Sequence, residues 1–176
     1  MLKNTLFILF LCGTSGLAAQ TWAPVVGVEK MKIQDQIAPA ARFFPVQEVQ
    51  LTDSPFKKAM DLDVAYLLSL EPDRLLHRFH LNAGLPVKGA VYGGWESMGI
   101  SGHSLGHYLS ALALGWAATQ DARLLDKLNY TIDELERCQN ARGTGYVGGI
   151  PSEDSAFAQI AAGNITSDGF DLNGLW

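Results

Sequence analysis

The sequence predicts a mainly α-helical protein, a partial (α/α)6 toroid of helical hairpins with one short N-terminal strand. A stretch without any charged side chain, residues 104–118, is followed at once by an amphipathic stretch, residues 121–137. A helix that is apolar on nearly all sides must be buried nearly all round, whereas an amphipathic helix buries one face. An inner helix joined by a short turn to a covering helix is the repeating unit of a toroid, although a plain helical bundle shows the same pattern.

The composition fits one globular domain. A chain of 176 residues can bury a hydrophobic core, and 48% hydrophobic with 18% charged residues is far from a disordered composition. The formal net charge of −5 comes with scattered basic residues. Because no basic patch is available for a phosphate backbone, we expect no nucleic-acid partner.

Residues 1–19 have the pattern of a secretory signal peptide. Lys3 precedes an apolar run from Leu6 to Cys12, and small residues follow that run. The run is much shorter than the roughly 20 residues that cross a bilayer, so we expect no stable membrane anchor after signal removal. The protein is therefore expected to be secreted or periplasmic. Residues 20–45 contain three prolines and little periodicity, which predicts an irregular arm.

The helical domain is expected over residues 46–176. An imperfect apolar alternation over 46–51 predicts the short strand. Glycine-rich loops follow over 84–102 and 142–151, with a weak helix near 156–162.

Two helices are expected before the apolar one. Asp53 or Ser54 can cap the first, with Pro55 in its first turn, where a missing N–H costs nothing. Pro72 ends this helix and opens a second one, and residues 82–84 supply its stop.

The amphipathic helix is expected to turn its charged residues to solvent. Its predicted buried stripe consists of Leu124, Leu125, Leu128, Ile132 and Leu135. Cys138 is the only cysteine outside the signal peptide, so no internal disulfide can form, and we expect a buried, inert thiol.

His103 and His107 are the first candidate site residues. They stand four residues apart at the start of the apolar helix, so both project from one side of it, together with Ser110 and Leu114. Neutral imidazoles at a helix N-terminus can donate and accept hydrogen bonds to sugar hydroxyls. Both rings can equally serve to satisfy backbone groups in a core. HSLGH lacks the glutamate of the HExxH pattern and two ligands do not close a zinc site, so no cofactor is expected in this chain.

The two glycine-rich loops add further candidates. In YGGWE, Trp95 and Glu96 offer an aromatic platform and a hydroxyl acceptor, and Tyr146 lies in GTGYVGG. The alternative is a tryptophan packed under its loop beside a solvated glutamate. Neither loop matches the GxGxxG or GxxxxGK[ST] phosphate patterns.

Several long strings occur in order over most of the chain after about residue 45: DSPFKKAMDLDVAYLLSLEPDRLLHRFHLNAGL, YGGWE, GISGHSLGHYLSALAL, ELERCQ with GYVGG, and FDLNGLW. They give the chain a resemblance to the N-terminal part of the catalytic domain of glycoside hydrolase family 127, the β-L-arabinofuranosidases. It implies an (α/α)6 barrel followed by β-sandwich domains, and removal of terminal β-linked L-arabinofuranose from plant glycans. In the family a cysteine thiolate is the nucleophile, beside a zinc ion held by cysteines and a glutamate, and another glutamate is the acid/base, which is retaining chemistry.

Those catalytic residues have no counterpart here, and Cys138 does not match the position of the catalytic or zinc cysteines. The resemblance thus implies a truncated glycosidase domain, inactive alone and only marginally stable, whose inner helix faces lack neighbours. Zinc is expected only in a full-length member. The residues expected to approach a carbohydrate substrate are Glu96, His103, His107 and Tyr146. Two alternatives remain: an α/α-toroid polysaccharide lyase, and a non-catalytic carbohydrate-binding or helical interaction module.

Overall fold

The computed structural model describes residues 44–167 and 172–175. The chain divides into two compact units, Met1–Pro45 and Val46–Trp176, and the second holds the helices described below. The predicted signal peptide and nearly all of the predicted arm lie outside the described residues. Over the described ranges, no helix combines the length and the apolar character that a membrane span requires.

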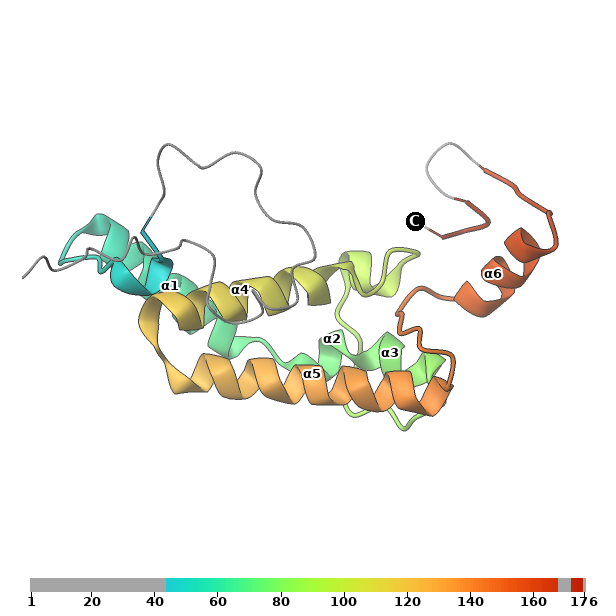
Figure 1. Cartoon of the computed structure of the whole chain (residues 1–176), viewed down its shortest axis with the longest axis horizontal. Helices are drawn as coiled ribbons and strands as arrows, with labels where there is room; N and C mark the ends of the chain where they lie inside the picture. Colours follow the sequence, from blue (N-terminus) through green and yellow to red (C-terminus); the bar gives the residue numbers. More distant parts are fainter. Residues whose placement is uncertain (1–43, 168–171, 176) are drawn as a thin grey trace, which may run out of the picture. The chain divides into compact units, whose positions relative to one another are not determined.

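A hairpin of two long helices forms the framework of the second unit. α4 (His103–Thr119) and α5 (Ala122–Arg142) run antiparallel and pack side by side (Figure 1). The turn between them needs only two residues. Gln120 closes α4 in the left-handed conformation with φ of 57°, and the Asp121 carboxylate accepts the Arg123 backbone N–H to start α5. The charge-free and amphipathic stretches thus form the predicted hairpin.

α1 (Pro55–Ser69) begins as the sequence predicted, because the Ser54 hydroxyl accepts the Lys57 backbone N–H at 3.2 Å. The second predicted helix is interrupted. It forms α2 (Pro72–Leu75) and α3 (His77–Asn82), and the buried Leu76 between them has φ of −77° and ψ of −9°, a right-handed turn conformation that departs from the regular helical ψ.

The strand predicted over 46–51 is wrong. Residues Val46–Glu48 form the 3-10 helix η2, and no strand follows them. A strand requires a partner for its backbone groups. In the described ranges the only bridges are isolated ones near the C-terminal end, and Val46, Val49 and Leu51 are exposed rather than alternately buried. Two more elements complete the unit: the 3-10 helix η3 (Gly94–Ser97) and α6 (Glu153–Ala161), which confirms the weak helix predicted there.

α5 packs against α1, α2, α3 and α4, so the core forms between this helix and the others (Figure 1). The core residues are Leu75, Leu76, Phe79, Leu105, Tyr108, Leu112, Leu124 and Cys138. The predicted burial of Cys138 is confirmed, since its side chain is 0% exposed and burial raises the pKa of its thiol.

The buried stripe of α5 differs from the predicted one. Ile132 is 49% exposed, whereas Thr131 and Glu134 are buried. The Thr131 hydroxyl donates to the Lys127 carbonyl at 2.7 Å, so its polarity is satisfied within the helix. The prediction that every charged residue of this helix faces solvent is therefore wrong for Glu134.

Glu134 is buried because three donors surround it. Its carboxylate accepts from His80 Nε2 at 2.8 Å, Lys88 Nζ at 2.9 Å and Arg137 at 2.7 Å. Burial alone would raise the pKa of this carboxyl, but the hydrogen bonds from Lys88, Arg137 and His80 outweigh it and lower the pKa to about 2.

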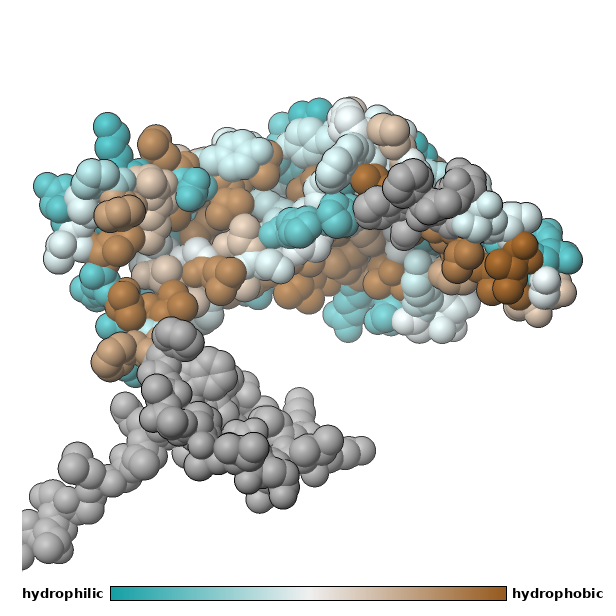
Figure 2. Space-filling view, turned by 90° about the horizontal axis from the view of Figure 1, so that it is seen from above, coloured by the Kyte–Doolittle hydropathy of each residue, from teal (hydrophilic) through white to brown (hydrophobic). Residues whose placement is uncertain are grey.

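α4 is buried on one face in the described part of the chain, not all round as its composition predicted. Leu105 and Leu112 point into the core, whereas Leu114 is 62% exposed. Figure 2 shows apolar surface in several separate patches on the face seen from above. Among the described residues, α4 packs against α5, α1, η2 and η3, and the face that carries Leu114 is covered by none of them.

Candidate functional site

A cleft of about 250 Å³ lies where α4 begins and where the chain leaves α5. Because the two helices are antiparallel, the start of one and the end of the other lie at the same end of the hairpin. The walls of the cleft are Phe79 of α3, residues 100–103 and residues 146–150. His103 and Tyr146, two of the four predicted site residues, line it, one from the start of α4 and the other from the loop after α5.

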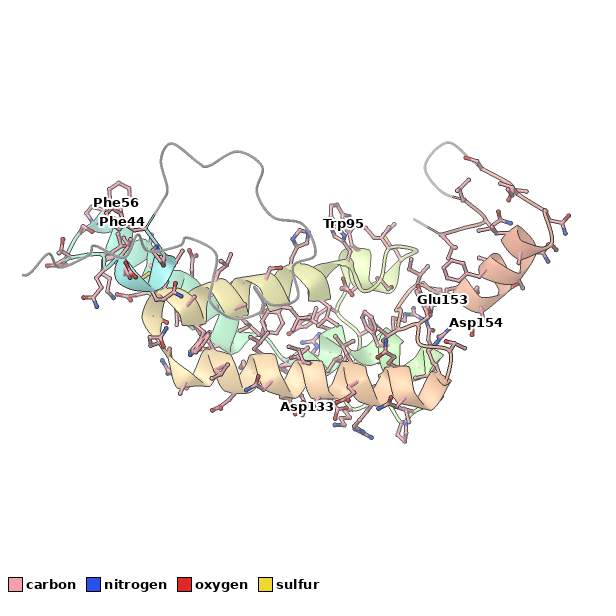
Figure 3. All side chains as sticks on the ribbon, viewed as in Figure 1. Phe44, Phe56, Trp95, Asp133, Glu153 and Asp154 are labelled. Carbon is pink, nitrogen blue, oxygen red and sulfur yellow. The ribbon has the colours of Figure 1, made fainter. Side chains whose placement is uncertain are left out.

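His103 and His107 lie on the same side of α4, as the helical period predicts, and both side chains are exposed. Their Nε2 atoms are 3.1 Å apart, and their ring centroids are 4.7 Å apart with the planes at 76°. The indole of Trp95 lies edge-on to the His103 ring at 6.0 Å and is 61% exposed, pointing away from the α4–α5 hairpin (Figure 3). His107 is not among the residues that line the cleft. The face therefore presents two imidazoles and an indole next to the cleft mouth.

Glu96 lies at the base of this face and is buried. Its two carboxylate oxygens accept the backbone N–H groups of Gly102 at 2.9 Å and Ser104 at 3.0 Å. Gly102, with φ of 95°, is the residue before the helix and has no side chain that could cap it. Glu96 thus takes over the capping of α4 and fixes the position of His103. The sequence did not reveal this role, since a capping glutamate is expected inside the first helical turn rather than several residues before it.

Tyr146 belongs to the part of the cleft that the loop after α5 forms. It is 38% exposed, its hydroxyl donates to Glu153 at 3.3 Å, and its ring packs edge-on against Phe157 at 5.3 Å. Burial, together with the charge of Glu153, raises the pKa of Tyr146, so the hydroxyl stays protonated. Tyr146 therefore presents a fixed aromatic ring to the cleft.

The loop that carries Tyr146 is held by residues that the sequence did not identify as functional. Glu153 is 1% exposed and accepts the Ile150 backbone N–H at 3.2 Å and the Arg142 guanidinium at 2.8 Å (Figure 3). The Asn82 amide donates to the carbonyls of Gly148 at 3.3 Å and Ile150 at 3.0 Å. Asn82 was predicted only to end a helix, and nothing in its local sequence indicates a contact with a loop more than sixty positions away.

Gly148 is required by this packing. A Cβ built on it would lie 2.5 Å from the Tyr146 hydroxyl and would also collide with the Glu153 carboxylate. The loop can therefore approach these two groups closely only because residue 148 has no side chain.

The zinc of the resembled family does not fit the residues described here. In residues 44–167 and 172–175, no group of three or more His, Cys, Asp or Glu side chains could hold a metal ion. Cys138, the one cysteine in these ranges, is sealed in the core and its thiol pKa is raised by burial, which is the opposite of a thiolate ligand or nucleophile.

Comparison with known proteins identifies the family. No curated protein matches the chain. The model of the β-L-arabinofuranosidase, GH127 catalytic domain matches residues 48–176, which is well over half of the chain. This range contains the hairpin, the cleft and all four predicted site residues, and a glycoside hydrolase domain has a carbohydrate as its substrate. The chain belongs to the GH127 family of glycoside hydrolases, through its β-L-arabinofuranosidase catalytic domain.

Proposed function

We propose that this chain forms one wall of the sugar cleft of a secreted or periplasmic glycosidase. The enzyme would remove terminal β-linked L-arabinofuranose from plant-type glycans with retention of configuration. The observation that carries the proposal is the convergence of His103 and Tyr146 on one cleft, within a chain of the GH127 family.

The chemistry of the cleft suits a sugar. Sugar rings offer hydroxyl groups to polar side chains and C–H faces to aromatic ones. In the cleft, the His103 imidazole can donate or accept hydrogen bonds and Tyr146 offers aromatic surface; outside its lining, His107 and the exposed Trp95 add a second imidazole and an indole next to His103. The volume of about 250 Å³ is below the roughly 300–1,000 Å³ of sites for drug-sized ligands, which supports a single sugar unit as the occupant.

We assign binding rather than bond cleavage to the described residues. The carboxylates of Glu96 and Glu153 each accept backbone N–H groups, and Glu153 also pairs with Arg142, so both are engaged in holding the walls. Cys138 is inaccessible. The nucleophile and the acid/base of the family would therefore come from other parts of the catalytic domain.

The test uses p-nitrophenyl β-L-arabinofuranoside as ligand. We expect the chain to bind it, as followed by ligand-observed NMR, without releasing p-nitrophenol. Loss of one hydrogen bond of about 1 kcal/mol weakens binding roughly fivefold, which is the expected effect of His103→Ala. Asp133→Asn, a change at an exposed position of α5, is the matched control and should bind as the unchanged chain does.

Two results would contradict the proposal. Binding that does not differ between His103→Ala and the control would exclude the cleft as the sugar site. Release of p-nitrophenol by the chain alone would show that the described residues do more than bind.

A further inference from the structure

The two exposed imidazoles of α4 have the geometry of a two-ligand metal chelate. The Nε2 atoms of His103 and His107 are 3.1 Å apart, and the ring planes are at 76°. A zinc–imidazole bond is about 2.0–2.1 Å long. Two nitrogens 3.1 Å apart that share one ion at this bond length subtend an angle of about 95–102° at the metal. This lies between the ideal angles for octahedral and tetrahedral coordination, so the nitrogens need not move apart.

We propose that His103 and His107 together bind one divalent transition-metal ion of the Cu²⁺, Ni²⁺ or Zn²⁺ class, with water completing its coordination. Imidazole nitrogen is a suitable ligand for all three ions, and Cu²⁺ should bind most tightly. Without a metal, an Nε2–H···Nε2 hydrogen bond connects the two rings. Metal binding moves this proton from Nε2 to Nδ1 of the same ring, since both Nε2 atoms must then offer a lone pair.

The surroundings of the pair tolerate a cation. Residues 104–118 carry no charged side chain that could repel the ion. The N-terminus of α4 itself has a partial positive charge, which disfavours a cation near His103. The Glu96 carboxylate, however, accepts the backbone N–H groups of Gly102 and Ser104 at this same helix end, and its negative charge offsets that partial charge.

The site differs from the zinc centre of the family. Within the described part of the chain it contains no cysteine, lies on the exposed face of a helix and offers two protein ligands, so the metal should exchange with solvent. The proposal does not depend on sugar binding, because the two nitrogens and their separation are sufficient for it.

The test is a titration of the chain with CuCl₂ in the absence of sugar. Trp95 lies 6.0 Å from His103, so bound Cu²⁺ should quench its fluorescence, and Trp95→Phe should remove most of the quenching without changing the affinity. We expect one ion per chain, with two nitrogen ligands visible by electron paramagnetic resonance. Loss of an outer-shell partner already weakens metal binding about 10- to 100-fold, so His103→Ala and His107→Ala should each weaken it at least about tenfold.

His77→Ala is the matched control, since this histidine lies on α3 and its Nδ1 contacts the Gly89 carbonyl at 2.7 Å. It should keep the affinity of the unchanged chain. His107→Gln preserves a polar side chain of similar reach and should lose binding as His107→Ala does, while circular dichroism checks that the helices persist. Equal Cu²⁺ affinity in the unchanged chain and in either His107 variant would overturn the proposal.

Discussion

Replacement of Glu134 by glutamine should destabilise the fold and remove part of its acid sensitivity. The folded state lowers the pKa of this carboxyl from 4.5 to about 2, although burial alone would raise it. A difference of this size corresponds to about 3 kcal/mol in favour of the folded, charged form. Two of the donors, Lys88 and Arg137, have side chains that are 36% and 54% exposed, so solvent screens them and we expect about 2 kcal/mol.

The pH dependence follows from the direction of the shift. Because the folded pKa lies below the unfolded one, the stabilisation is complete above about pH 4.5 and is lost as the pH falls toward 2, with more than half gone by pH 3. The measurement is the free energy of unfolding in urea at pH 7 and pH 3, followed by circular dichroism.

Glu134→Gln should be less stable at pH 7 and should lose less stability between pH 7 and pH 3 than the unchanged chain. The neighbouring Asp133 points away from the core and is exposed (Figure 3), so Asp133→Asn should stay within about 0.5 kcal/mol of the unchanged chain. The reasoning is refuted if Glu134→Gln keeps the full difference between the two pH values.

Four further outcomes are expected. Leu112→Ala should cost about 2–5 kcal/mol in urea unfolding because Leu112 is 0% exposed, whereas Leu114→Ala at a 62% exposed position should cost little. Gly148→Ala should displace the cleft loop and abolish glycoside binding in the NMR assay, whereas Gly93→Ala, with open space around the added carbon, should not. Cys138 should react with a thiol reagent only in denaturant; rapid labelling of Cys138 in the folded chain, located by peptide mass spectrometry, would contradict its burial. Thermal melting of the chain should be broad and end at low temperature, since the described residues leave one face of α4, its most apolar helix, exposed.

The helices were predictable because their signals are local. Ser54 caps α1 and Asp121 caps α5 through their own side chains, and the absence of charge in 104–118 identifies α4 without knowledge of its neighbours. The predicted common face of His103 and His107 needed only the helical period.

The wrong predictions concern features that depend on residues far away in the sequence. Glu134 is buried because His80 and Lys88 approach it from elsewhere in the chain, and periodicity cannot detect these partners. Val46 belongs to an alternating pattern, but the described residues contain no strand that pairs with it, and it lies in a 3-10 helix instead. The sequence also gave no sign that Glu96 caps α4, because the connection depends on how the intervening loop folds back.

The amide of Asn82 holds two carbonyls of a loop more than sixty residues later, and this has a kinetic consequence. A contact of such long range forms only after the chain has closed a large loop, whereas the helices need only local contacts. We therefore expect the cleft wall to assemble late in folding and to open early when the protein is stressed. Glycoside binding should consequently be lost at a lower denaturant concentration than helical content. Binding is therefore a more sensitive measure of the native state than helical content is.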